Sequence, residues 1–148
     1  MTVTDSLPVA PPDAPSADGL PRRRTRVRPA APSGPSPIDL ARRIVELAED
    51  KKAAEIVLLE LGPLTTLADY FVICSGGSER QLDAIADGII EGMREMGERP
   101  IGREGTPDSH WVLIDFGSTV VHIFTQPERD FYQLEKNWSS AKTILRVQ

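Results

Sequence analysis

The sequence predicts an α/β domain in which helices pack on a mixed sheet of about five strands. Short apolar runs of strand length alternate with longer segments whose apolar residues recur at helical spacing. In chain order these segments are helix, strand, strand, helix, strand, strand, strand and helix, an order typical of a layered α/β fold. The last two strands are separated only by Gly117-Ser118, which favours an antiparallel hairpin.

The first 36 residues differ in composition from the rest of the chain. Nine of the 13 prolines lie at or before Pro37, and most of the other residues there are Ala, Ser, Asp, Gly and Arg. Proline removes amide donors, and few of these side chains can be buried in a core. We therefore expect a disordered Pro/Arg-rich tail over residues 1–36 and one folded domain over residues 37–148.

Charge divides along the same boundary. Three aspartates of the tail stand against five arginines, which are Arg22, Arg23, Arg24, Arg26 and Arg28. The tail therefore carries +2, and since the whole chain carries −5, the folded part carries −7. An acidic domain should repel nucleic acid and favour a basic partner, whereas the arginines could contact RNA weakly. A solubilising role is the simpler interpretation of the tail.

The cysteine content and hydropathy indicate a cytoplasmic protein. Cys74 is the only cysteine, so no disulfide framework holds the fold. No stretch approaches 18 consecutive apolar residues, and the N-terminus lacks the apolar core of a secretory signal. We therefore expect no contact with a membrane.

The first helix is expected to begin at Ser36-Pro37. The serine caps the helix, proline occupies the first turn, and Asp39 suits the positive end of the helix dipole. The apolar stripe consists of Ile38, Ala41, Val45 and Ala48. Two strands follow over residues 55–61 and 69–74, and the nearly continuous apolar run of the first indicates burial on both faces.

The longest helix is predicted over residues 78–96 and ends at Gly97, which tolerates positive φ. Its apolar stripe consists of Leu82, Ile85, Ala86, Ile89, Met93 and Met96. Three strands are then expected over residues 99–102, 110–116 and 119–125. A capping box of Thr125 and Glu128 begins the last helix, which carries the side chains of Phe131, Tyr132, Leu134 and, near its end, Trp138.

The stretch CSGGSERQ, residues 74–81, joins a strand to the longest helix and has two interpretations. Ser78 and Gln81 fit a capping box, and Gly76 and Gly77 allow a sharp turn. Alternatively, the free amides at the helix start could hold a phosphate. The capping interpretation is favoured because neither the P-loop Lys-Ser pair nor a complete G-x-G-x-x-G is present.

Other residues that could carry chemistry have simpler structural explanations. Asp115 has no acidic residue two positions away, so the sequence offers no carboxylate pair for divalent metal. His110 and His122 do not have zinc-site spacing, and His122 is expected to be a hydrogen-bonded structural histidine. Cys74 ends a strand and is expected to be buried rather than reactive. No metal, cofactor or catalytic residue is therefore assigned.

Aromatic and acidic residues gather in the C-terminal half, where two interpretations stay open. The aromatic residues of this segment include Trp111, Phe116, Tyr132 and Trp138, and the acidic ones Asp108, Asp115, Glu128, Asp130 and Glu135. Aromatic anchors surrounded by carboxylates suit docking to a basic protein surface. The same aromatics could instead complete the core of a small domain.

Four blocks, ADYFVICSGGSERQLDAIAD, REG, WVLIDFGSTVVHIF and FYQLEKNW, occur in this order. Together they resemble the ribosomal silencing factor family, also called Iojap-like proteins. The resemblance extends over about residues 38–138, nearly the whole folded part, and leaves out the tail. It implies a fold like that of nucleotidyltransferases without their catalytic acids, in agreement with the missing carboxylate pair.

The resemblance implies a binding protein and not an enzyme. Members of the family bind the large ribosomal subunit at its protein numbered fourteen, block association with the small subunit, and repress translation under nutrient limitation. On this basis Trp111 and Tyr132 are expected to be exposed docking anchors, with Leu134 adding apolar area. From charge, we expect Asp115, Glu128 and Glu135 to contact basic side chains of the partner.

Two alternatives remain open at this point. A nucleotidyltransferase-like enzyme would bind a nucleoside triphosphate with metal. A homodimeric adaptor would self-associate through an edge strand and the aromatic residues, and a homodimer away from the ribosome is also compatible with ribosome binding.

Overall fold

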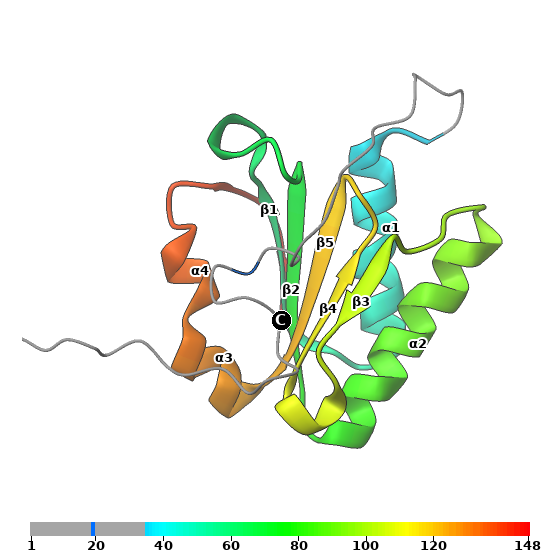
Figure 1. Ribbon diagram of the computed structural model, residues 1–148, viewed down its shortest axis with the longest axis vertical. Helices are drawn as coiled ribbons and strands as arrows, with labels where there is room; N and C mark the ends of the chain where they lie inside the picture. Colours follow the sequence, from blue (N-terminus) through cyan, green and yellow to red (C-terminus); the bar gives the residue numbers. More distant parts are fainter. Residues whose placement is uncertain (1–18, 20–34) are drawn as a thin grey trace, which may run out of the picture.

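The computed structural model describes Gly19 and residues 35–148. In this part of the chain, one mixed sheet has helices packed on both of its faces (Figure 1). Of the tail predicted over residues 1–36, residues 1–18 and 20–34, including all five arginines, lie outside the described residues. No described helix is both long and apolar enough to cross a membrane.

The helices and strands follow one another in an order close to the predicted one. They are α1 (Pro37–Asp50), β1 (Ala54–Glu60), the 3-10 turn η1 (Gly62–Leu64), β2 (Tyr70–Gly76), α2 (Glu79–Glu95), β3 (Gly102–Glu104), the 3-10 turn η2 (Pro107–Ser109), β4 (Trp111–Asp115), β5 (Thr119–Thr125), α3 (Gln126–Tyr132), α4 (Leu134–Asn137) and β6 (Lys142–Val147).

The sheet has six strands in the order β3-β4-β5-β2-β1-β6. Only the central pair, β2 and β5, is parallel, and the other four pairs are antiparallel. In the β4–β5 hairpin Trp111 lies opposite Phe124 and Leu113 opposite His122, so the predicted antiparallel hairpin is confirmed. The α/β class with a mixed sheet is confirmed as well, with six strands in place of about five.

Each face of the sheet carries its own apolar core, because alternate side chains of a strand point to opposite faces. On the first face α1 and α2 cover a cluster that includes Ile56, Leu58, Val72 and Cys74. On the second face, on the left of Figure 1, α3 and α4 lie over the sheet. The core there consists of Val57, Leu59, Leu61, Ala68, Phe71, Ile73, Trp111, Leu113, Val120, Phe124, Tyr132 and Leu134.

Helix α2 forms as predicted because its sequence satisfies both of its ends. The Ser78 side chain accepts a hydrogen bond from the Gln81 amide at the start, and Gly97 has φ +84 just past the end. The predicted stripe is fully buried from Leu82 to Met93, whereas Met96 follows the last helical residue and is 36% exposed. Ser36 likewise caps α1, accepting from the Asp39 amide.

Two strand predictions differ from the structure. The strand expected over residues 99–102 lies at Gly102–Glu104, where three residues pair with β4. Strand β6 was not predicted, and it pairs along the edge of β1 from Ile56 to Glu60. Its residues are exposed or half-buried, so it lacks the apolar run that indicates a strand in a sequence.

The predicted last helix is divided into α3 and α4 by Gln133, which has φ +50 in the left-handed region. Thr125 precedes α3, but its side chain makes no capping hydrogen bond, so the capping box predicted for Thr125 and Glu128 is wrong. The Thr125 hydroxyl is buried without a partner among the described residues. Tertiary packing against the sheet therefore determines how this segment begins and breaks.

Candidate functional site

Most of the residues predicted for docking come together on the side of the sheet covered by α3 and α4. Trp111 begins β4, Tyr132 ends α3 and Leu134 begins α4 (Figure 1). The Trp111 and Tyr132 ring centroids are 4.7 Å apart, and all three side chains belong to the same apolar core. We use the name α3–α4 face for the surface formed by these two helices, residues 126–132 and 134–137.

The expectation that Trp111 and Tyr132 are exposed is wrong. Trp111 is 0% exposed, Tyr132 8% and Leu134 1%. The Trp111 ring stacks on Phe124 at 4.8 Å, and α3 places Tyr132 over it. Because the inward side of β4 faces a layer of helix, these aromatics fill the core between helix and sheet.

Phe131 is the aromatic residue of the α3–α4 face that meets solvent. Its side chain is 59% exposed, and its ring contacts the Tyr132 ring edge-on at 5.5 Å. Successive helical residues are rotated by about 100°, so Phe131 points outward when Tyr132 points inward. The order Phe-Tyr in the sequence does not indicate which ring is buried, and the structure exposes Phe131 rather than Tyr132.

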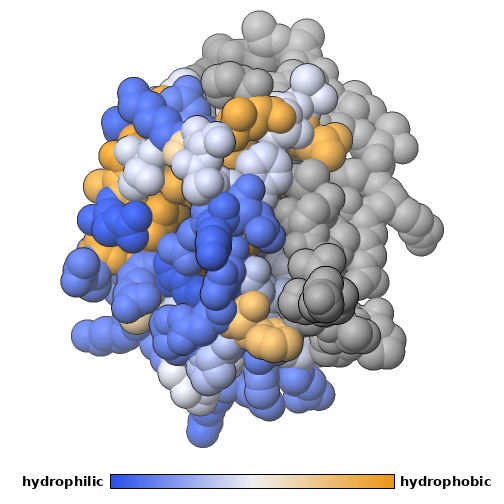
Figure 2. All heavy atoms as spheres, turned by 90° about the vertical axis from the view of Figure 1, so that its left-hand side faces the viewer, coloured by the Kyte–Doolittle hydropathy of each residue, from blue (hydrophilic) through white to orange (hydrophobic). Residues whose placement is uncertain are grey.

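Helix α3, which carries Phe131, also carries two acidic residues. Glu128 is half-buried and Asp130 is exposed, with Asp130 accepting a hydrogen bond from Gln126 at 2.9 Å. Burial and then the charge of Glu128 raise the pKa of Tyr132. In Figure 2, which views this side, hydrophilic residues occupy most of the middle and hydrophobic residues form separate patches.

Glu135 is engaged within the domain by a buried arginine. Arg129 donates from Nε to Glu135 Oε1 at 3.0 Å and from Nη2 to Oε2 at 2.8 Å. The third contact of Arg129 goes from Nη1 to the Ser75 hydroxyl at the end of β2, at 2.8 Å. The hydrogen bond from Arg129 holds the pKa of Glu135 below its usual value, although partial burial acts in the opposite direction.

This ion pair borders a polar pocket of about 250 Å³ at the end of the sheet. Glu55 and Arg146 contribute to its lining from β1 and β6. Both acidic and basic side chains line it, so the pocket offers no field of one sign for a charged ligand.

Asp115 lies apart from the other predicted docking residues. It ends β4, four residues from Trp111, which corresponds to about 13 Å along a strand. Its side chain is 2% exposed and accepts a hydrogen bond from the Gly117 amide at 2.8 Å. Asp115 therefore stabilises the turn between β4 and β5, and the structure does not support its predicted contact with a partner.

His122 is buried beside Trp111 and is a structural histidine, as predicted. The Trp111 indole Nε1 donates to His122 Nδ1 at 3.2 Å, and the Phe71 ring meets the imidazole edge-on at 4.5 Å. Burial lowers the pKa of His122 to about 3. The imidazole is therefore neutral near pH 7, and since Nδ1 accepts, its proton is on Nε2.

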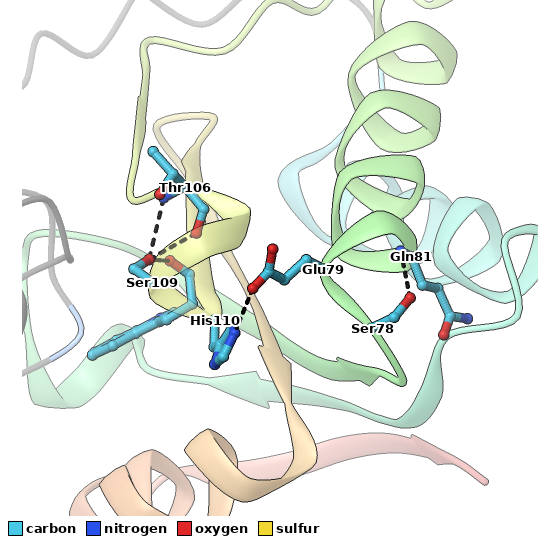
Figure 3. Close-up of polar contacts among 7 residues, drawn as sticks. Ser78, Glu79, Gln81, Thr106, Ser109 and His110 are labelled. Atoms are coloured by element: carbon cyan, nitrogen blue, oxygen red, sulfur yellow. Dashed lines mark hydrogen bonds and ion pairs between the residues drawn. The ribbon is translucent and has the colours of Figure 1, made fainter.

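The glycine-serine corner forms a capped helix start (Figure 3). Ser78 Oγ accepts from the Gln81 amide at 3.1 Å, and Gln81 Oε1 accepts from the Gly77 amide at 2.6 Å. In a standard capping box the glutamine side chain would accept from the amide of Ser78 itself, whereas here it accepts from the amide of Gly77, one residue earlier. Gln81 Nε2 also donates to the Lys52 carbonyl at 3.0 Å, which joins the corner to the loop after α1. Two amides that a phosphate would need are thus already engaged, which favours the capping interpretation.

The loop before β4 packs against the same corner. His110, with φ +64, places its Nε2 2.8 Å from a Glu79 carboxylate oxygen (Figure 3). Ser109 Oγ lies 2.7 Å from the Thr106 carbonyl oxygen and 2.9 Å from that of Trp111. These contacts position the start of β4 and hence Trp111.

The described residues offer neither a cluster of metal ligands nor a reactive thiol. Within the described residues, no three His, Cys, Asp or Glu side chains are grouped to hold a metal ion. Cys74 is fully buried in the first core, and burial raises the pKa of its thiol to about 12, as expected for an unreactive cysteine.

Similarity to known proteins extends over the whole domain. Residues 35–148 match a family model described as ribosomal silencing factor during starvation. A ribosomal silencing factor from Halalkalibacterium halodurans is 41% identical over 106 residues, which cover 72% of this chain and 91% of the relative. A mouse protein named for mitochondrial assembly of the ribosomal large subunit is 32% identical over 99 residues, covering 65% of this chain and 43% of that protein. A crystal structure of a Chromobacterium violaceum protein superposes with a TM-score of 0.69 at 31% identity, covering 71% of this chain and 88% of that one.

Proposed function

The chain belongs to the ribosomal silencing factor family, and from this membership we propose that it binds the large ribosomal subunit through the ribosomal protein numbered fourteen. Bound there, it prevents association with the small subunit and represses translation when nutrients are limiting. The mechanism is steric and requires no catalysis. The site of action is the cytoplasm. The family description, which names starvation, and the name of the mouse relative, which names the large subunit, support this proposal.

The observation that carries the proposal is the composition of the α3–α4 face. Phe131 offers an exposed aromatic ring that contacts the Tyr132 ring, and Glu128 and Asp130 add carboxylates to the same helix. An aromatic residue that is desolvated on binding supplies affinity, and the surrounding acids direct the approach of a basic surface. The −7 charge of the folded part favours the same kind of partner.

The residues beneath this surface have a supporting role in the proposal. Trp111, Tyr132 and Leu134 hold α3 and α4 on the sheet and so present Phe131 to the partner. Glu135 orients α4 through Arg129 and offers its exposed edge to basic side chains. Replacing Trp111 would disturb the core as well as binding, so Phe131 is the better probe.

The test is sedimentation of the purified protein with isolated large and small subunits, followed by a subunit-joining assay. We expect binding to large subunits alone and fewer joined ribosomes as the protein is added. Phe131→Ala should weaken binding by about 5- to 30-fold, since losing the burial of a large ring costs about 1–2 kcal/mol. Leu64→Ala, at a 45% exposed residue of η1, is the control and should bind like the wild type. Normal joining in the presence of excess protein would refute the proposal.

Self-association away from the ribosome is a further part of the proposal. Strand β6 is an edge of the sheet, and Leu145 on it is 36% exposed. An edge strand presents unpaired backbone groups that can pair with a second copy. Sedimentation equilibrium of the isolated protein measures this directly.

Contact of the tail arginines with ribosomal RNA is a separate hypothesis. A change in the salt dependence of ribosome binding after replacement of these arginines would support it.

A further inference from the structure

The polar pocket beside the Arg129–Glu135 ion pair has features of a binding site that the proposed function does not use. Its volume is about 250 Å³, and its charged lining comes from α3, α4, the start of β1 and the end of β6. Pockets for drug-sized ligands span about 300–1,000 Å³, so this one suits a smaller molecule. A more open hollow shares Arg129, Asp130 and Glu135 with it, so a ligand could extend beyond the pocket.

Arg129 supplies the pocket with hydrogen-bond donors that the domain itself does not use. A guanidinium group has five N–H groups. Two of them donate to Glu135 and one donates to Ser75, at 2.8 to 3.0 Å. The other two, one on each terminal nitrogen, have no partner among the described residues, although the side chain is only 4% exposed. Buried donors without partners are costly, and a ligand carboxylate would satisfy them with charge-assisted hydrogen bonds.

Glu55 places a carboxylate on the same pocket from a strained segment of backbone. Its φ is +49, in the left-handed region that residues with long side chains rarely adopt. The pairing of β1 with β2 shifts in register between Ala54 and Val57, so Glu55 lies in an irregular part of the strand. Such irregularities redirect side chains, and backbone strain of this kind is concentrated at functional sites. The Glu55 side chain is exposed and has no hydrogen bond or ion pair in the described part of the chain.

Arg146 adds a second guanidinium group to the pocket. It is exposed, lines the pocket together with Glu55, and forms no ion pair with it or with any other described residue. The pKa of Glu135 is lowered chiefly by the hydrogen bond from Arg129, and the charge of Arg146 adds to that shift. Two guanidinium groups therefore act on one carboxylate, which leaves one positive charge for a ligand carboxylate.

The distribution of charge disfavours a ligand of a single sign. A simple anion such as phosphate would be attracted by the two arginines but repelled by the three carboxylates of Glu55, Asp130 and Glu135, and a simple cation would meet the opposite conflict. A molecule that carries a carboxylate close to an ammonium group would find a partner for each.

We propose that this pocket binds a free α-amino acid. Its carboxylate accepts hydrogen bonds from Arg129 and Arg146, and its ammonium group donates to Glu55 and Asp130. In an α-amino acid both charged groups are attached to one carbon, which suits a pocket of about 250 Å³ lined by both signs of charge. The site is independent of the proposed function, because its evidence is the pocket alone.

The surroundings of the pocket favour an amino acid with a polar side chain. Val147 is the only apolar residue that lines the pocket in the described part of the chain. The adjoining hollow adds Gln133 and Lys136, which are both polar and exposed. A large apolar side chain would therefore gain little burial there, whereas a carboxamide or hydroxyl group would find hydrogen-bond partners.

The test is a titration of the full-length protein with each of the twenty natural L-amino acids, followed by ¹H–¹⁵N NMR that includes the Arg129 Nε signal. We expect L-glutamine and other polar amino acids to shift this signal with dissociation constants of about 0.1–5 mM, the range expected for so small a ligand. N-acetyl-L-glutamine lacks the ammonium group and L-glutamine amide lacks the carboxylate, so each should bind about 10-fold more weakly. Failure of all twenty amino acids to bind would overturn the proposal, as would equal binding of either derivative.

Two substitutions locate the site without disturbing the core. Glu55→Gln and Arg146→Gln change exposed side chains, and each should weaken glutamine binding by about 10-fold. The matched controls are Glu49→Gln and Lys142→Gln, which make the same changes at exposed residues outside the lining and should bind like the wild type. The NMR spectra also report whether each variant is folded. Wild-type affinity in both folded pocket variants, or equal losses in the controls, would show that the amino acid does not bind in this pocket.

Discussion

The ion pair between Arg129 and Glu135 offers the sharpest test of how the α3–α4 face is held. The guanidinium makes two hydrogen bonds to the carboxylate and a third to Ser75 on β2. Glu135→Gln keeps the size of the side chain and one acceptor but removes the negative charge. The charge of Arg129 then remains in a buried place without compensation, because arginine cannot lose its proton there.

The size of the effect follows from the exposure of the two side chains. Arg129 is 4% exposed and Glu135 is 35% exposed, so the pair lies between a buried and a surface ion pair. Removing one partner of a buried pair costs about 3–5 kcal/mol, whereas an exposed pair contributes about 0–1 kcal/mol. Since Gln retains one hydrogen bond, we expect a loss of about 2 kcal/mol in the free energy of unfolding. In a domain of this size, that lowers Tm by about 8 °C.

The assay is urea and thermal unfolding followed by far-UV circular dichroism, with Asp130→Asn as the control. Asp130 is exposed and has one hydrogen bond within α3, so the control removes the same charge at a cost below about 0.5 kcal/mol. A Glu135→Gln protein as stable as Asp130→Asn would refute the reasoning, because it would show that Arg129 does not need its partner.

The pH dependence provides a second readout of the same pair. Hydrogen bonding from Arg129 lowers the pKa of Glu135 in the folded state. A carboxyl group with a lowered folded pKa contributes stability above its unfolded pKa of about 4.3, and the contribution is lost as pH falls through the folded pKa. The difference between the wild type and Glu135→Gln should therefore be complete at pH 7 and shrink below about pH 4. A difference that stays constant over this range would show that the carboxylate charge is not its source.

Two further predictions concern α2. Ser78→Ala should lower the free energy of unfolding by about 1 kcal/mol, measured by urea unfolding, because the Gln81 amide loses its cap; no change would indicate that water replaces the hydroxyl without loss. Gly88→Ala should raise the free energy of unfolding by up to about 1 kcal/mol, since the new methyl group meets only the movable Lys51 side chain. Gly92→Ala should lower it by about 1–2 kcal/mol, because the new methyl group would lie 2.6 Å from Leu47 Cδ1 in the core. Urea unfolding measures both, and a Gly92→Ala protein more stable than Gly88→Ala would contradict this packing.

The outcome for the candidate site shows where sequence reasoning reached its limit. The family resemblance placed Trp111, Tyr132 and Leu134 in one docking surface, and the structure brings the three side chains together, but in a buried core. It could not distinguish aromatic residues that fill a core from those that meet a partner, since both uses favour the same residue types. Exposure separates the two groups, and on the α3–α4 face Phe131 is the exposed aromatic residue.

The sequence by itself determined the features that depend on neighbours in the chain: the caps at Ser36 and Ser78, the hairpin around Gly117, and the helix and strand periodicities. These follow from local backbone sterics and hydrogen bonding, which a few adjacent residues control. Only the tertiary structure decided the pairing of β6 with β1 and the partners of Arg129. Each of these joins residues far apart in the chain, and such contacts depend on how whole elements pack rather than on any local pattern.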